Sequence, residues 1–72
     1  MKLTYRQKQI LELMCNDMNQ KHISFKLETS LSLVEKEVKF LKDIFKVETN
    51  SGLIYKYLTR NVTNEFINNF LF

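Results

Sequence analysis

The absence of proline and the near absence of glycine limit what this chain can fold into. Its 72 residues include no proline, and Gly52 is the only glycine. Tight β-hairpin turns favour glycine at positive φ, so a sheet of several strands is disfavoured. Hydrophobic residues make up 44% of the chain, which is enough for a core and argues against disorder. We therefore expect an all-α protein.

The length of the chain sets the scale of the fold. A chain of 72 residues forms one domain, at 1–72, in which we expect a core of about residues 3–60 and a C-terminal tail at 61–72. A core of this size supports a net stability of roughly 3–5 kcal/mol. A partner that binds only the folded form would add to that stability.

Two helices are predicted at the start of the chain. In residues 3–18, Thr4 and Gln7 form a capping box, in which each side chain satisfies a backbone donor at the helix start. Apolar residues follow at helical spacing, namely Ile10, Leu11, Met14, Cys15 and Met18. Residues 19–29 predict a short second helix, for which Asn19 is a good N-cap.

Residues 30–45 predict the longest of the early helices, with Ser30 or Ser32 as its N-cap. At 100° per residue, one apolar stripe is formed by Val34, Val38, Leu41 and Phe45, and a second by Leu33, Phe40 and Ile44. The remaining arc is a polar ridge of Ser32, Glu35, Lys36, Lys39, Lys42, Asp43 and Lys46. We expect this helix to pack on two sides and to expose the ridge. The short turn before it predicts a steep crossing with residues 19–29, as in a helix-turn-helix.

The rest of the chain predicts a fourth helix and a short last one. Asn50 or Ser51 is the expected N-cap of the fourth, whose apolar side carries Leu53, Ile54, Tyr57 and Leu58. Thr63 is the expected N-cap of the last, which carries Phe66, Ile67, Phe70 and Leu71. Four asparagines in this tail lower its helix propensity.

Several classes of function have no support in the sequence. The lone cysteine, Cys15, falls among apolar positions and is expected to be an inert thiol. There is no Cys/His cluster of zinc spacing, no phosphate loop and no pair of catalytic carboxylates, so we expect no metal, no other cofactor, no small-molecule ligand and no enzyme. No apolar run approaches the roughly 18 residues that span a bilayer, and no secretory signal opens the chain. We expect a cytoplasmic protein without membrane contact, and a net charge of +3 is compatible with a polyanionic partner.

The spacing of several residues is similar to a known family. The chain reads Leu3-Thr4-x-Arg6-Gln7-x-Gln9-Ile10-Leu11-x-Leu13, then Asn19-Gln20-Lys21-x-Ile23-Ser24-x-x-Leu27-x-x-Ser30, then Val34 and Val38, then Phe45-x-Val47. This order resembles the LuxR/GerE-type helix-turn-helix, whose usual pattern is LTxRExEVLxL, SNKEIAxxLxIS, TVKxHV and KLxV. The similarity covers about residues 3–58 without a gap.

The resemblance implies a fold and a way of binding DNA. The expected fold is a four-helix domain of this type with a short C-terminal helical extension, similar to the small stand-alone members of the family. The helix at 30–45 would enter the major groove of double-stranded DNA, and the fourth helix would form a homodimer. The implied activity is sequence-specific regulation of transcription.

The same resemblance, together with residue chemistry, assigns candidate site residues. Base contacts would come from Glu35, Lys36 and Lys39, because lysine donates to guanine and glutamate accepts from cytosine N4. Phosphate contacts would come from Asn19, Gln20, Lys21, Ser32, Lys42 and Lys46. The dimer interface would include Leu53, Ile54, Tyr57, Leu58, Phe66 and Phe70. The alternative for the four residues of 53–58 is that they close the core of the single chain.

The chain departs from the family pattern at the ridge. Leu33, Glu35 and Glu37 stand where the family has threonine, a basic residue and histidine, and Asn50 replaces an arginine. A second hypothesis follows: an interaction protein of the same fold that does not read DNA. It would bind RNA polymerase or another LuxR-type regulator. On this view, Glu35 and Asp43 only pair with Lys39 along a solvated face.

Overall fold

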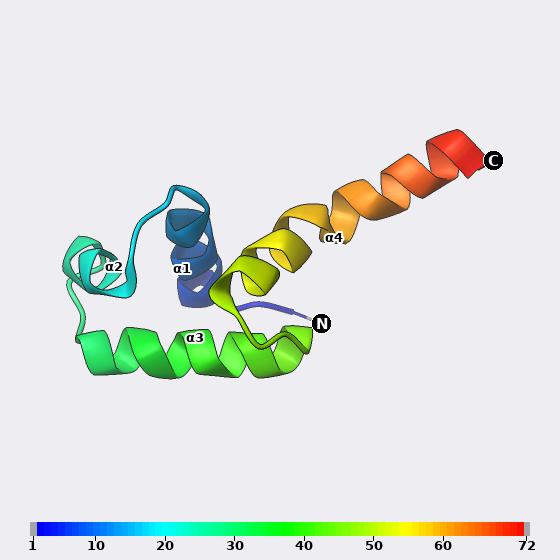
Figure 1. The fold of residues 1–72 in the computed structure, drawn as a ribbon. Coiled ribbons are helices and arrows are strands. Elements are labelled where there is room, and N and C mark those ends of the chain that lie inside the picture. Colours follow the sequence, from blue (N-terminus) through cyan, green and yellow to red (C-terminus); the bar gives the residue numbers. More distant parts are fainter. Residues whose placement is uncertain (1, 72) are drawn as a thin grey trace.

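The computed structural model describes the backbone of residues 2–71 and the side chains of residues 2–60. In that part of the chain there are four helices and no strand, which confirms the all-α class. In order these are α1 (Tyr5–Cys15), α2 (Gln20–Lys26), α3 (Leu31–Phe45) and α4 (Asn50–Leu71) (Figure 1). Among the described residues, no helix is both long enough and apolar enough to cross a membrane.

Side-chain caps determine where the first three helices begin. The Thr4 hydroxyl accepts from the Gln7 amide at 3.1 Å and the Gln7 side-chain oxygen accepts from the Thr4 amide at 2.9 Å, which confirms the predicted capping box. Asn19 Oδ1 accepts from the His22 amide at 2.9 Å, so Asn19 is the N-cap of α2, as predicted. Of the two candidates for α3, Ser30 is the cap, and its hydroxyl accepts from the Leu33 amide at 3.1 Å.

The predicted start of α4 was wrong by one residue. The hydroxyl of Thr49 accepts from the Gly52 amide at 3.0 Å, so Thr49 takes the role expected of Asn50 or Ser51. The predicted separate helix after Thr63 is also wrong, because α4 runs from Asn50 to Leu71. Extending an existing helix avoids the cost of nucleating a new one, which outweighs the weak propensity of the asparagines.

Three helices end in the same way. Asp17, Glu28 and Lys46 have positive φ angles of 62°, 54° and 58°, in the left-handed region that usually takes glycine. After each of them, an amide donates to the carbonyl five residues earlier: Met18 to Leu13, Thr29 to Ser24, and Val47 to Lys42. This is the hydrogen bond of a Schellman motif, here formed at all three sites without glycine.

The core lies where α1, α3 and the first half of α4 meet, and α2 packs on α1 and α3 (Figure 1). Its buried apolar residues are Ile10, Leu11, Met14, Ile23, Val34, Val38, Leu41, Leu53 and Tyr57. Figure 1 shows α2 nearly end-on while α3 lies across the view, so the two helices cross steeply, as the short turn between them predicts.

The lone glycine lies where the chain enters α4. A Cβ atom at Gly52 would lie 3.2 Å from Thr49 Oγ1 and 3.3 Å from Val47 Cβ, which is tighter than an ordinary contact. The start of α4 therefore packs closely against the turn that follows α3. The φ angle of Gly52 is not positive, so what distinguishes glycine here is its small size: a larger residue would require Thr49 or Val47 to shift by a few tenths of an ångström.

Packing of α3 on two sides is not observed. Its first stripe is buried through Val34, Val38 and Leu41, whereas Leu33 and Ile44 of the second are half-buried and Phe40 is 53% exposed. The other helices cover only one side of α3, because all of them lie on the side of the first stripe. The exposed arc of α3 is therefore wider than the polar ridge alone.

Burial predicts a large loss of stability for a substitution at one residue and a small loss at its neighbour. Leu41→Ala leaves a cavity in the core and should cost about 2–5 kcal/mol, enough to unfold much of the protein. Phe40→Ala removes a larger side chain from an exposed position and should cost less than about 1 kcal/mol. Urea denaturation followed by far-UV circular dichroism measures both. Equal losses of stability in the two variants would contradict this account of the core.

Candidate nucleic-acid interface

The outer side of α3 is held in place by the buried stripe opposite to it. Val34, Val38 and Leu41 have almost no exposed surface, so α3 cannot rotate about its axis without breaking the core. Glu35, Lys36 and Lys39, the three predicted base contacts, are all exposed on the outer side. Lys36 and Lys39 are three residues apart and therefore neighbours on the helix surface. The structure brings these three residues together on one face.

The predicted phosphate contacts differ in how accessible they are. Asn19, Lys21, Ser32 and Lys46 are exposed, whereas Gln20 and Lys42 are half-buried. The side-chain oxygen of Asn19 is already engaged in capping α2. Ser32 and Lys46 lie near opposite ends of α3, about 21 Å apart along its axis. They therefore flank the three predicted base contacts at both ends.

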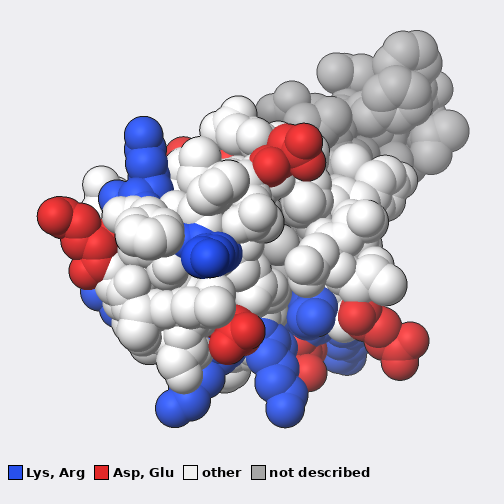
Figure 2. All heavy atoms as spheres, turned by 60° about the vertical axis from the view of Figure 1, so that its left-hand side comes forward, with Lys and Arg blue, Asp and Glu red and all other residues white. Residues whose placement is uncertain are grey.

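Charges of both signs occur on this face. The ridge carries four lysines and two acids, Glu35 and Asp43, so its excess is positive but modest. Figure 2 shows basic and acidic side chains interspersed along the lower edge of the molecule, where α3 lies in Figure 1. Glu37 lies further round the helix and is half-buried. Such a face attracts a polyanion weakly as a whole and more strongly at its lysines.

Two exposed phenylalanines were not predicted as surface features from the sequence. Phe25 of α2 is 73% exposed, and Phe40 of α3 is 53% exposed. Phe40 adjoins Lys39 and lies one helical turn after Lys36, so it belongs to the same outer side of α3. The helical projection could have indicated this, because it places Phe40 almost opposite to Val38.

The predicted dimer residues divide between core and surface. Leu53 has no exposed surface and Tyr57 is buried. These two residues therefore close the core of the single chain, and their prediction as interface residues is wrong. Arg60 fixes Tyr57 further: its guanidinium lies 4.2 Å from the ring centre and donates to the Tyr57 carbonyl at 2.7 Å. Ile54 is half-buried and Leu58 is 54% exposed, so these two can face a partner.

One further residue, Tyr55, belongs to this surface of α4. Tyr55 is largely exposed and was not among the predicted interface residues. The predicted contacts Phe66 and Phe70 lie outside the residues whose side chains the structure describes. The accessible apolar surface of the described part of α4 is therefore made by Ile54, Tyr55 and Leu58.

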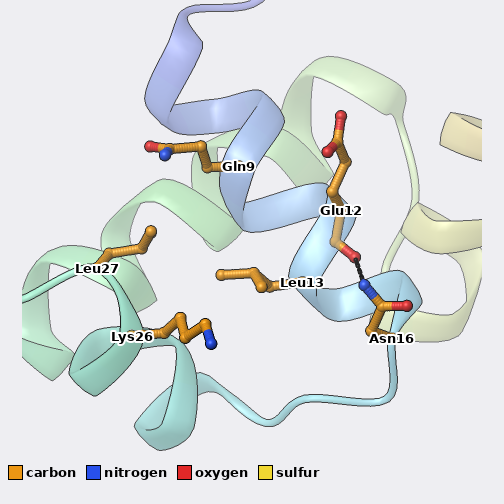
Figure 3. Close-up of a pocket in the computed structure, with 6 residues that line it drawn as sticks. All are labelled: Gln9, Glu12, Leu13, Asn16, Lys26 and Leu27. Carbon is orange, nitrogen blue, oxygen red and sulfur yellow. Dashed lines mark hydrogen bonds between the residues drawn. The ribbon is translucent and has the colours of Figure 1, made fainter.

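A hollow lies between α1 and α2, away from the ridge. It has a volume of about 310 Å³ and is lined by Gln9, Glu12, Leu13, Asn16, Lys26 and Leu27 (Figure 3). Leu13 points from α1 toward α2, with Leu27 across from it, and polar side chains form the rim. The Asn16 side-chain amide donates to the Glu12 carbonyl at 3.1 Å. The residues that line the hollow form no set of converging catalytic groups.

Two chemical features of the described residues are the spacing of their metal-binding side chains and the state of the Cys15 thiol. In the described part of the chain, no three His, Cys, Asp or Glu residues are close enough to hold a metal ion. Burial raises the pKa of the Cys15 thiol, and the neighbouring Glu12 carboxylate raises that pKa further. The thiol is therefore protonated at neutral pH, as an inert structural cysteine should be.

Comparison of the chain with protein-family models, with curated proteins and with solved structures gave no match. The placement of side chains on the described helices is therefore the basis on which a function can be inferred. On the outer side of α3, charged side chains are exposed together, opposite the buried stripe.

The state of Cys15 can be tested by alkylation. Iodoacetamide should modify Cys15 in the folded protein more slowly at neutral pH than in the urea-unfolded chain, because the raised pKa leaves less thiolate. The rate should rise only at a higher pH than in the unfolded chain. Glu12→Gln should partly restore the rate, since it removes the second of the two causes. A folded protein that reacts as fast as the unfolded chain would contradict the assignment.

Proposed function

We propose that the protein is a sequence-specific regulator of transcription of the LuxR/GerE helix-turn-helix type, which binds double-stranded DNA as a homodimer. The observation that carries this proposal is the outer side of α3, where Glu35, Lys36 and Lys39 are exposed together. The buried stripe on the opposite side gives these side chains a fixed orientation. A rigid helix with polar groups on its outer face is what reading of the major groove requires.

The chemistry of the three side chains suits base edges. Lysine ammonium groups donate to guanine O6 and N7, the commonest specific contact in the major groove. The carboxylate of Glu35 can accept from cytosine N4, so the acid contributes to specificity where a cytosine lies opposite. At bases that offer no donor, no hydrogen bond offsets the repulsion between this carboxylate and the phosphates. The proposed target is therefore rich in G·C pairs at the positions under Glu35, Lys36 and Lys39.

Phosphate contacts would position α3 on the duplex. Ser32 and Lys46 are exposed near opposite ends of the helix, and their separation of about 21 Å exceeds the major-groove width of about 12 Å. Side chains at both ends can therefore reach the backbones that border the groove. Lys21 at the start of α2 adds a third exposed donor. Contacts of this kind set the register of the protein without selecting a sequence.

The homodimer is proposed to form through α4. Leu58 and Tyr55 leave apolar surface exposed on this helix, and Ile54 is half-buried beside them. Two copies joined along this surface would present two α3 helices to the same duplex. A pseudo-palindromic site with half-sites about 34–36 Å apart would match such an arrangement.

A second candidate function is favoured by the exposed phenylalanines. Phe25 and Phe40 offer apolar surface of the kind that binds protein, and Glu35 and Glu37 weaken attraction to phosphate. The chain would then bind RNA polymerase or another LuxR-type regulator and modulate transcription without reading DNA. A pull-down with purified RNA polymerase distinguishes the two functions. Binding that persists in Lys36→Ala/Lys39→Ala, together with no affinity for any duplex, would favour the second.

A salt titration tests the proposed DNA binding. Affinity for a duplex selected from a random pool should fall steeply as salt rises, because bound lysines release counterions. Lys39→Ala should weaken binding to the selected site by about tenfold or more and should relax its specificity. Lys8→Ala, an exposed lysine of α1, is the matched control and should change the affinity little. Absence of binding to every duplex at low salt would reject the proposal.

Stability and DNA affinity should change in opposite directions at Lys46. Lys46→Gly relieves the left-handed backbone and should raise the free energy of unfolding by about 1 kcal/mol, while it removes a proposed phosphate contact. Glu28→Gly relieves the same backbone geometry at the end of α2, at a residue type that tolerates it as poorly as lysine does, and is the matched control. It should raise stability equally without weakening DNA binding. Urea denaturation and fluorescence anisotropy measure the two effects, and equal affinities of both variants would remove Lys46 from the interface.

A further inference from the structure

Phe40 is the one large apolar side chain of α3 that its own chain leaves mostly exposed next to the lysines. It is 53% exposed, adjoins Lys39 and lies one helical turn after Lys36. At 100° per residue, Phe40 points about 160° away from Val38 of the buried stripe. Phe40 therefore lies on the side of α3 that faces away from the core. Its exposed surface is available to whatever binds the outer side of α3.

The flanking side chains indicate the chemistry of that partner. Lys36 and Phe40 point within about 40° of each other, so one partner surface meets an ammonium group and an aromatic ring together. The major groove of DNA combines acceptors for lysine, on guanine, with one apolar group on its base edges, the C5-methyl of thymine. Phenylalanine is among the side chains that contact this methyl group. The two neighbouring side chains thus match two different base edges in one groove.

We propose that Phe40 reads thymine through its C5-methyl group, an inference that rests on the proposed DNA-binding function and adds a base to it. Lys36 and Phe40 are four residues apart, a rise of about 6 Å along α3. Successive bases on one strand are about 3.4 Å apart along the duplex. The thymine therefore lies within about two base pairs of the guanine bound by Lys36. Each half-site contains both.

The experiment removes one methyl group at a time. Duplexes bound by the full chain are selected from a random pool, and each thymine of the preferred site is then replaced singly by deoxyuridine, which lacks only the C5-methyl. For the wild-type protein, one replacement in each half-site should weaken binding about fourfold, the effect expected for one buried methyl group. Phe40→Ala should bind the thymine site more weakly and should not distinguish thymine from deoxyuridine there.

Phe25→Ala is the matched control. It removes the same ring from an exposed position of α2, so it should keep the wild-type sensitivity to deoxyuridine. Circular dichroism of Phe40→Ala checks that it folds, and Phe40→Leu, which keeps an apolar contact, should retain part of the sensitivity.

The possible outcomes separate this inference from the proposed function. A wild-type protein that binds DNA with no loss at any deoxyuridine overturns the reading of thymine and leaves DNA binding standing. The reading of thymine is also overturned if Phe40→Ala keeps the wild-type sensitivity, or if it changes only the oligomeric state, which would assign Phe40 to a protein contact. Failure of the wild-type protein to bind any duplex overturns the proposed function and this inference with it.

Discussion

Burial of a single stripe of α3 against α1 and α4 is the interaction on which the rest of the structure depends. Val34, Val38 and Leu41 belong to one core cluster with Ile10, Leu11 and Leu53, and all six are nearly or completely buried. This contact fixes the rotation of α3 about its axis and thereby decides which of its side chains face solvent. A core this small supplies little stability beyond what folding needs, so the loss of one buried contact is costly. The direction in which α3 presents its outer face therefore depends on this core.

Local features of the fold could be predicted from the sequence, because they depend on residues three or four positions apart. The capping box of Thr4 and Gln7, the Asn19 cap and the buried stripe of α3 are of this kind. The start of α4 was harder to predict, since Thr49, Asn50 and Ser51 are three adjacent residues that can all serve as caps. Of the left-handed residues at the helix ends, Asp17 is of a type that tolerates this backbone, whereas Glu28 and Lys46 gave no signal, because neither is glycine.

The candidate site could also be predicted only in part from the sequence. Periodicity groups the polar residues of α3 correctly, but it does not reveal how many sides of the helix other helices cover. Phe40 therefore looked like part of a second core stripe and is instead exposed beside Lys39. Leu53 and Tyr57 illustrate the reverse error, since the apolar side of α4 serves the core first and leaves Leu58 at the surface. Tertiary packing, which the linear pattern does not contain, decides both cases.

The close approach at Gly52 has a consequence for geometry far from it. With no side chain there, the first turn of α4 lies close to Thr49 and Val47, at the junction where α4 departs from α3. In a dimer joined through α4, the angle between α3 and α4 at this junction would affect the distance between the two α3 helices. A larger residue at position 52 would then alter that distance as well as the local packing.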